Sequence, residues 1–358
     1  MLGESQMLTR RLIRIKVLQT IYLYEIYQHL NGESLPPYRL EDAMATLRSY
    51  LNEFLDLQHF LLSLLPLFSR KAQELLQEEE KKHLPREEYL QLLRPLAEDA
   101  LCAAIHNNNA LLDSEYVKGL EASLQSPAFL HIFQEWLRTA PYKQYVAADG
   151  SDKKKRLAAI QEMTGALYSW LFSSWYEEIE AEEKLLESLP HNNQSNVPFG
   201  KSYLQKFFLD APLTYTSDLE LAARQVTERI HKLKELPAPE TKLTTKPVLA
   251  DELEFAEQLL LKMISNSGEH QALIKENLHN WELDRLKKTD LIIIELGITE
   301  LLYCPDIPTR VTLNEYVDIA SQFAANEALP FINGVLDNIL RQLESKGRIH
   351  KNFEAQKQ

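Results

Sequence analysis

Four cations near the N-terminus are the residues of this sequence best placed to bind a charged ligand. Helical periodicity begins with them, at Arg10, Arg11, Arg14 and Lys16. The helix macrodipole disfavours cations at a helix N-terminus, so their clustering there points to a function. Arginines can contact phosphates and stack on unpaired bases, and Tyr22 further along offers a stacking surface. Taken alone, the pattern fits a solvated helix face better, and an RNA-contacting patch is the functional alternative.

Catalytic and metal-binding patterns are weak by comparison. No Gly-rich loop follows a strand, so a Rossmann-type nucleotide site lacks its signature. Glu-x-x-His spacing, which serves di-iron sites in helical bundles, occurs at Glu80/His83, Glu228/His231 and Glu276/His279. Chance spacing in Glu-rich helices explains these pairs better. Cys102 and Cys304 have no neighbours at metal-ligand spacing. We therefore expect no enzyme, no metal and no cofactor.

The composition indicates an acidic, helical, globular protein. The chain has 358 residues, 45% hydrophobic and 25% charged, with a net charge of −13. Ten glycines are few, which disfavours Gly-rich phosphate cradles and turn-dense β folds. Two cysteines cannot build a disulfide framework, so we expect a cytoplasmic protein. No apolar run approaches the roughly 20 residues of a membrane span, so we expect no membrane contact.

Apolar periodicity predicts helices along most of the chain and no strand. The first covers residues 10–30 and has Thr9 as its N-cap. Ser126 followed by Pro127 marks the start of another helix, and Ser151-Asp152 precedes a third. The segment 237–247 holds three prolines and reads as a linker.

The sequence after the linker carries sharper signals. We expect a helix over 251–264, ended by Asn266-Ser267-Gly268, and a second over 284–303, which is apolar on nearly all sides and therefore buried. Thr312-Leu-Asn-Glu315 fits a capping box, with Val311 and Tyr316 as its hydrophobic staple. The last helix covers about 330–343, where Gly334 permits close approach of another helix.

The order of these segments resembles a known family. RRLIRIKVLQTIY at the start is similar to the first helix of the NusB family of transcription antitermination factors. WELDRLKKTDLIIIELGITELLY, DIPTRVTLNEYVDIASQF and PFINGVLDNIL follow in the family's order. The resemblance implies an all-α, NusB-type helical bundle with a large helical insertion. It assigns the RNA-binding core to 1–31 and 245–345, the insertion to 32–244 and a basic tail to 346–358.

The resemblance also implies a function without catalysis. NusB proteins pair with the ribosomal protein that doubles as NusE, bind single-stranded boxA RNA of ribosomal RNA leaders, and act through the elongating RNA polymerase. RNA contacts then fall on Arg10, Arg11, Arg14, Lys16, Tyr22, Asp284, Glu327 and Phe331. The sequence departs from the family at Leu12, where a third consecutive arginine often stands, and at AANEALP (324–330), which lacks the usual Gly and Asp.

Two other functions compete with this one, and we expect the second to be nearly excluded. A helical protein–protein adaptor without RNA binding of its own would account for the altered 324–330 loop. NusB-like domains are also fused to ribosomal RNA cytosine methyltransferases, which need a downstream cofactor domain with a Gly-rich turn and a catalytic Cys. Residues 344–358 are too few for such a domain.

Overall fold

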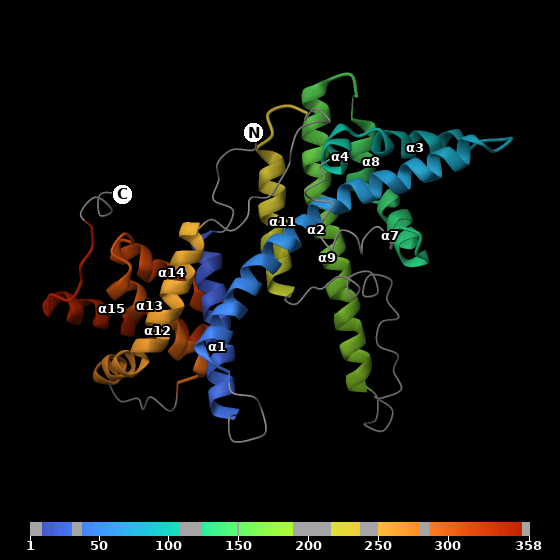
Figure 1. Cartoon of the computed structure of the whole chain (residues 1–358). Coiled ribbons are helices and arrows are strands. Elements are labelled where there is room, and N and C mark those ends of the chain that lie inside the picture. Colours follow the sequence, from blue (N-terminus) through green and yellow to red (C-terminus); the bar gives the residue numbers. More distant parts are fainter. Residues whose placement is uncertain are drawn as a thin grey trace. The chain divides into compact units, whose positions relative to one another are not determined.

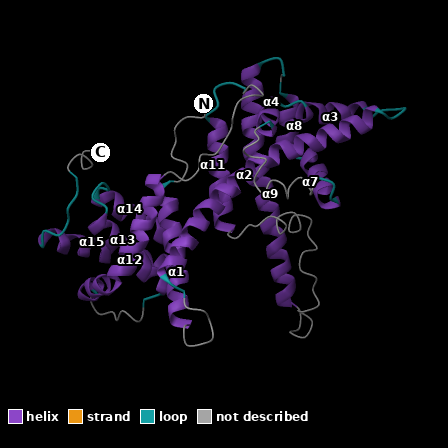
Figure 2. Ribbon diagram, viewed as in Figure 1, coloured by secondary structure: helices purple, strands orange, loops and turns teal. Residues whose placement is uncertain are grey.

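A computed structural model describes residues 9–30, 38–107, 124–148, 150–188, 216–236, 250–278 and 286–352. Throughout these residues the regular structure is helical, without a strand, as Figures 1 and 2 show. This confirms the predicted all-α class. In the described parts of the chain, no helix is both long and apolar enough to cross a membrane.

The chain divides into two compact units. The core unit comprises Gln6–Asn52 and Lys246–Gln358, and the insertion unit lies within Glu53–Thr245. The helices of the core unit are α1 (Arg10–Leu30), the start of α2 (Leu40–Glu80), α12 (Ala250–Asn277), α13 (Lys288–Tyr303), α14 (Thr309–Phe323), the short 3-10 helix η3 (Asn326–Ala328) and α15 (Leu329–Ser345). The unit boundary falls inside α2, whereas the sequence places it near residue 31.

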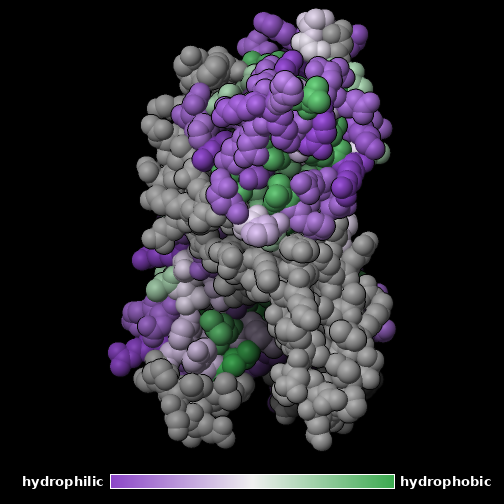
Figure 3. Space-filling model, turned by 90° about the vertical axis from the view of Figure 1, so that its right-hand side faces the viewer, coloured by the Kyte–Doolittle hydropathy of each residue, from purple (hydrophilic) through white to green (hydrophobic). Residues whose placement is uncertain are grey.

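The insertion unit is built from the rest of α2 and a set of shorter helices. These are α3 (Glu87–Ala97), α4 (Ala100–His106), α7 (Pro127–Arg138), α8 (Ala140–Ala147), α9 (Lys153–Ser188) and α11 (Thr216–His231). Helix α9 packs against α8 and α11, and α8 also contacts α3 and α7. On the face in Figure 3, the described surface is mostly hydrophilic, with smaller hydrophobic areas between.

Helix α13 is the centre of the core unit. It packs against α1, α12, α14 and α15, and every residue from Asp290 to Leu301 is buried. Because neighbours surround it on all sides, its sequence is apolar nearly all round. This confirms that the segment is buried, as its sequence pattern predicts.

Local signals fix two helix starts as expected. The Thr9 hydroxyl accepts a hydrogen bond from the Leu12 backbone N–H at 3.2 Å, and α1 covers the predicted residues 10–30. The Ser126 hydroxyl accepts from the Phe129 N–H at 3.1 Å, with Pro127 as the first helical residue. Each cap satisfies a backbone donor that has no partner inside its helix.

Three local predictions about helices α12 and α14 are wrong. Helix α12 continues past Gly268 to Asn277, because a glycine costs a helix only about 1 kcal/mol and buried residues follow it. Helix α14 begins at Thr309, so Thr312 is no cap. Its hydroxyl instead donates to the Glu300 carboxylate at 2.9 Å, and the proposed staple residue Val311 is exposed.

The close helix approach occurs at a different glycine from the one predicted. A Cβ on Gly334 would meet no atom within 4 Å. A Cβ on Gly297 of α13 would lie 2.7 Å from a methyl carbon of Leu336 on α15. The small residue at position 297 therefore allows α15 to pack closely on α13.

The sequence predicts a basic tail after α15, but the described part of it, up to residue 352, contacts the core unit. Lys351 is buried, and its Nζ donates to the carbonyl oxygens of Glu300 at 3.0 Å and Cys304 at 2.7 Å. A cation at the C-terminal end of α13 is favoured by the helix macrodipole. The chain up to residue 352 is therefore attached to the core unit.

Candidate nucleic-acid interface

Arg10 is the most accessible of the four predicted cations. It is exposed at the first position of α1, and its guanidinium lies 5.3 Å from the ring centroid of Phe255 on α12. No ion pair joins it to any residue that the structure describes. A guanidinium stacked on a ring in this way is held in place while its N–H groups stay available to a phosphate.

Arg11 is half-exposed and bound by two acidic side chains of α14. Its Nη2 lies 2.8 Å from a Glu315 carboxylate oxygen and 2.6 Å from Asp318 Oδ2, and its Nε donates to Glu315 at 3.1 Å. The hydrogen bond to Glu315 raises the pKa of Arg11 against the opposing effect of burial. A phosphate would have to compete with these carboxylates for the same donors.

Arg14 is buried, so its side chain has almost no surface left for the predicted RNA contact. Only 2% of its side chain is exposed, and Glu300, its main partner, is fully buried. Nε and Nη2 donate to the two Glu300 oxygens at 2.6 and 2.8 Å. Burial lowers the pKa of Arg14, but the hydrogen bonds to Glu300 more than offset it and raise the pKa above its ordinary value.

Lys16, the other predicted RNA contact in this part of α1, is buried as well. Its side chain is 1% exposed, donates to Gln19 at 3.2 Å and lies over the ring of Tyr50. From residue 12 to 18 every position of α1 is buried. The cations break the macrodipole rule partly because the fold supplies internal acidic partners from α13 and α14.

The other predicted residues lie in different settings. Tyr22 is 40% exposed on α1, eleven residues after Arg11, which puts both on one side of the helix about 16 Å apart. Glu327 is exposed in η3, and Phe331 is half-buried in the first turn of α15. Asp284 lies outside the described residues.

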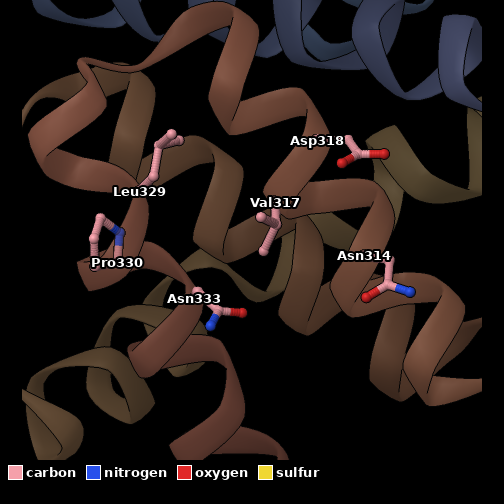
Figure 4. A pocket seen from close by; sticks show the side chains of 6 residues that line it. All are labelled: Asn314, Val317, Asp318, Leu329, Pro330 and Asn333. Atoms are coloured by element: carbon pink, nitrogen blue, oxygen red, sulfur yellow. The ribbon is translucent and has the colours of Figure 1, made fainter.

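A shallow pocket adjoins this region, with a volume of about 440 Å³. Asn314, Val317 and Asp318 line it from α14, and Leu329, Pro330 and Asn333 line it from α15. Figure 4 shows Val317 between the two apolar α15 residues on one side and Asn314 and Asp318 on the other. Asp318 connects the pocket to Arg11. The pocket therefore combines an apolar surface, two amides and a carboxylate beside an arginine.

The sequence motif NEYVDIA contains several of these residues, but its periodicity alone does not reveal their roles. The sequence pattern places Glu315 in a capping box and gives no role to Asp318 or Asn333. Glu315 and Asp318 are three residues apart on α14, and this spacing puts both carboxylates within reach of Arg11. Among the described residues, no group of three or more His, Cys, Asp or Glu side chains is placed to hold a metal ion.

Comparisons with known proteins agree with the resemblance. The NusB family profile matches residues 216–341. The structure packs α1, which lies outside that match, against matched helices α12, α13 and α14. No solved structure is significantly similar to the chain.

Three curated relatives share the printed name transcription antitermination protein NusB. The protein of Listeria innocua is 42% identical over 95 residues, which is 26% of this chain and 74% of the relative. That of Geotalea daltonii is 42% identical over 92 residues (26% and 63%), and that of Natranaerobius thermophilus is 40% identical over 90 residues (25% and 65%). At this identity and coverage, the chain belongs to the NusB family of transcription antitermination factors.

Proposed function

We propose that this protein binds boxA-type single-stranded RNA of ribosomal RNA leaders together with the ribosomal protein that doubles as NusE. The complex acts on the elongating RNA polymerase and supports ribosomal RNA synthesis. The observation that carries the proposal is the pair Arg10 and Arg11 at the start of α1, next to a pocket with amide and carboxylate groups. Residues 1–31 and 245–345 carry this function in the proposal, and 32–244 are the insertion.

Each group at this surface has a chemical part in RNA recognition. Arginines bind phosphates, which positions the strand without reading its sequence. Asn side chains pair with base edges, and a carboxylate accepts a hydrogen bond from an exocyclic amino group. Asp318 therefore disfavours a phosphate but suits a base, and Tyr22 and Phe331 offer rings for stacking. The pocket is open enough to admit an unstacked base.

Net charge decides how tightly the chain binds RNA alone. A protein of net charge −13 repels RNA at long range, whereas exposed arginines act within a Debye length of about 8–10 Å. A basic ribosomal protein bound to the acidic body reduces this repulsion. We therefore expect weak RNA binding by the isolated chain and strong binding by the mixture with NusE.

Fluorescence anisotropy with a leader RNA, across a salt series and with or without NusE, tests the proposal. Arg10→Ala and Arg11→Ala should each lower the log–log salt slope by roughly 0.7, the value for one phosphate of single-stranded RNA. Arg341→Ala, an exposed arginine near the other end of α15, is the matched control. An unchanged slope for both Arg10→Ala and Arg11→Ala would remove this surface from the RNA contact, and equal affinity with and without NusE would refute the charge argument.

A helical adaptor without RNA binding of its own is the second candidate. It gains support from the burial of Arg14 and Lys16 and from the carboxylates that occupy Arg11. Under this function the full chain captures NusE in a pull-down, and leader RNA is retained no better by the mixture than by NusE alone.

A further inference from the structure

The insertion unit carries a basic surface of its own, for which the family resemblance gives no role. We propose that the α8–α9 patch, defined as Lys143, Lys153 and Lys154, is a second RNA-contacting surface that binds phosphates without reading sequence. Its ligand class rests on the proposed function of the protein in RNA binding. The site itself is in a different unit from Arg10 and Arg11, so the two can be tested separately.

The patch is a local reversal of charge in an acidic protein. The stretch RTAPYKQYVAADGSDKKKR (138–156) has six cations and two acids, while the whole chain has a net charge of −13. Three consecutive lysines open α9, where the macrodipole disfavours cations. As in α1, this arrangement costs stability unless something compensates it.

Arg156 has an internal partner, which separates it from the lysines before it. Its guanidinium lies 4.0 Å from the ring centroid of Tyr145, and Nη2 donates to the Pro95 carbonyl oxygen at 2.7 Å. Nη1 donates to the Tyr145 carbonyl oxygen at 3.2 Å. These contacts attach the start of α9 to the end of α8 and to α3. Lys143 is two residues before Tyr145 on α8, and Lys153 and Lys154 are three and two residues before Arg156 on α9, so all three belong to the turns next to this contact between the packed helices.

The lysines of the patch lack a comparable internal partner. Lys143, Lys153 and Lys154 are exposed and form no ion pair with any residue in the described ranges. The Nζ of Lys155 lies 3.8 Å from Asp152 Oδ2, which makes a long and weak ion pair. Asp152 also accepts from the backbone N–H groups of Lys154 and Lys155. These backbone N–H groups are therefore already hydrogen-bonded, and an anion would bind to the ammonium groups of the exposed lysines.

The chemistry of the patch favours nucleic acid over an acidic protein. Protein interfaces are depleted of lysine and depend on buried aromatic or arginine anchors. Phosphates of a nucleic acid are instead commonly bound by lysine as a flexible point charge. The patch consists of exposed lysines, and the two tyrosines in the same stretch, Tyr142 and Tyr145, are buried. Such a surface fits a flexible phosphate backbone.

A charge-matched pair of variants of the full chain tests the proposal. One carries Lys143→Ala, Lys153→Ala and Lys154→Ala. The control carries Lys81→Ala, Lys232→Ala and Lys234→Ala, three exposed lysines elsewhere in the insertion unit. Both lower the net charge equally. The probe is a fluorescein-labelled 40-nucleotide oligo(U) RNA, titrated in 50–300 mM KCl and followed by anisotropy, with circular dichroism as the check on folding.

The patch variant should bind oligo(U) about tenfold or more weakly near 100 mM KCl, with a log–log slope lower by about 2, because three phosphate contacts are lost. The control should change less than about threefold. Equal weakening of both variants would show a long-range charge effect only and overturn the proposal, as would unchanged binding by the patch variant, the result expected of an acidic protein partner. Unchanged leader RNA binding in Arg10→Ala and Arg11→Ala, with the patch effect on oligo(U) intact, would overturn the α1 RNA surface of the proposed function and still support the α8–α9 patch.

Discussion

The Arg14 guanidinium is paired with the Glu300 carboxylate through two hydrogen bonds of 2.6 and 2.8 Å, with both side chains withdrawn from solvent. The two residues are 286 positions apart in the sequence. The same carboxylate accepts from the hydroxyls of Thr312 at 2.9 Å and Tyr316 at 3.3 Å. This cluster joins α1, α13 and α14, so the N-terminal helix is an integral part of the C-terminal core.

Arg14→Met should destabilise the core unit by about 3–5 kcal/mol, because the Glu300 carboxylate would stay buried without its cation. Urea unfolding followed by circular dichroism measures the loss, and hydrogen exchange should localise it to α1, α13 and α14. The double variant Arg14→Met/Glu300→Gln should recover part of the stability, since no charge is left unpaired. A loss below about 1 kcal/mol in the single variant would contradict the structural role.

Asp318→Asn should strengthen RNA binding, because asparagine keeps an oxygen that can accept a hydrogen bond from a base but carries no negative charge. The variant removes a carboxylate that holds Arg11 Nη2 at 2.6 Å, so a phosphate meets less competition and less repulsion. We expect leader RNA to bind about two- to fivefold more tightly, in line with up to about 1 kcal/mol for an exposed ion pair. Anisotropy at low salt measures the change. Glu344→Gln, an exposed residue at the far end of α15, removes the same charge and should have little effect; an equal gain would mean that net charge alone is responsible.

Glu295 should make the stability of the core unit depend on pH. It is fully buried on α13 and accepts a hydrogen bond from Gln271 at 3.0 Å. Burial raises its pKa from 4.5 to about 7, against the lowering effect of this bond. The folded state therefore holds its proton more tightly than the unfolded state does. The resulting stabilisation is complete below pH 4.5 and is lost as the pH rises towards 7.

In Glu295→Gln this contribution should vanish. Stability relative to the original protein should therefore increase by about 2–3 kcal/mol between pH 5 and pH 8. Urea unfolding at several pH values measures the difference. Burial lowers the pKa of His270 to about 4, so His270 lowers the stability as the pH falls below 6.5. Because His270 is present in both proteins, its effect cancels in the difference between them. A pH-independent difference would show that Glu295 ionises at its ordinary pKa.

Two glycine substitutions should act in opposite directions. Gly297→Ala places a methyl group 2.7 Å from a Leu336 methyl carbon in the core, and overpacking of this kind costs about 1–3 kcal/mol. Gly334→Ala meets no neighbouring atom and should stabilise α15 by about 0.4–1 kcal/mol, because alanine restricts the unfolded chain. Thermal unfolding of the two variants compares them directly. The same sign of change in both would show that the α13–α15 spacing differs from that described.

Several helices and their starts could be predicted from the sequence alone. The periodicity of α1, the caps Thr9 and Ser126, and the apolar α13 are local features, and each predicted its structure because helix formation and capping depend on residues a few positions apart. Composition and motif order likewise indicated the all-α class and the family.

Which cations of α1 face solvent depends on the packing of distant helices and could not be predicted from the sequence. Arg10, Arg11 and Arg14 lie within a few residues, yet one is exposed, one is shared with α14 and one is buried against α13. Their partners Glu300 and Asp318 are about three hundred positions away. Burial and ion pairing depend on which distant helix covers each position, and helical periodicity carries no information about that.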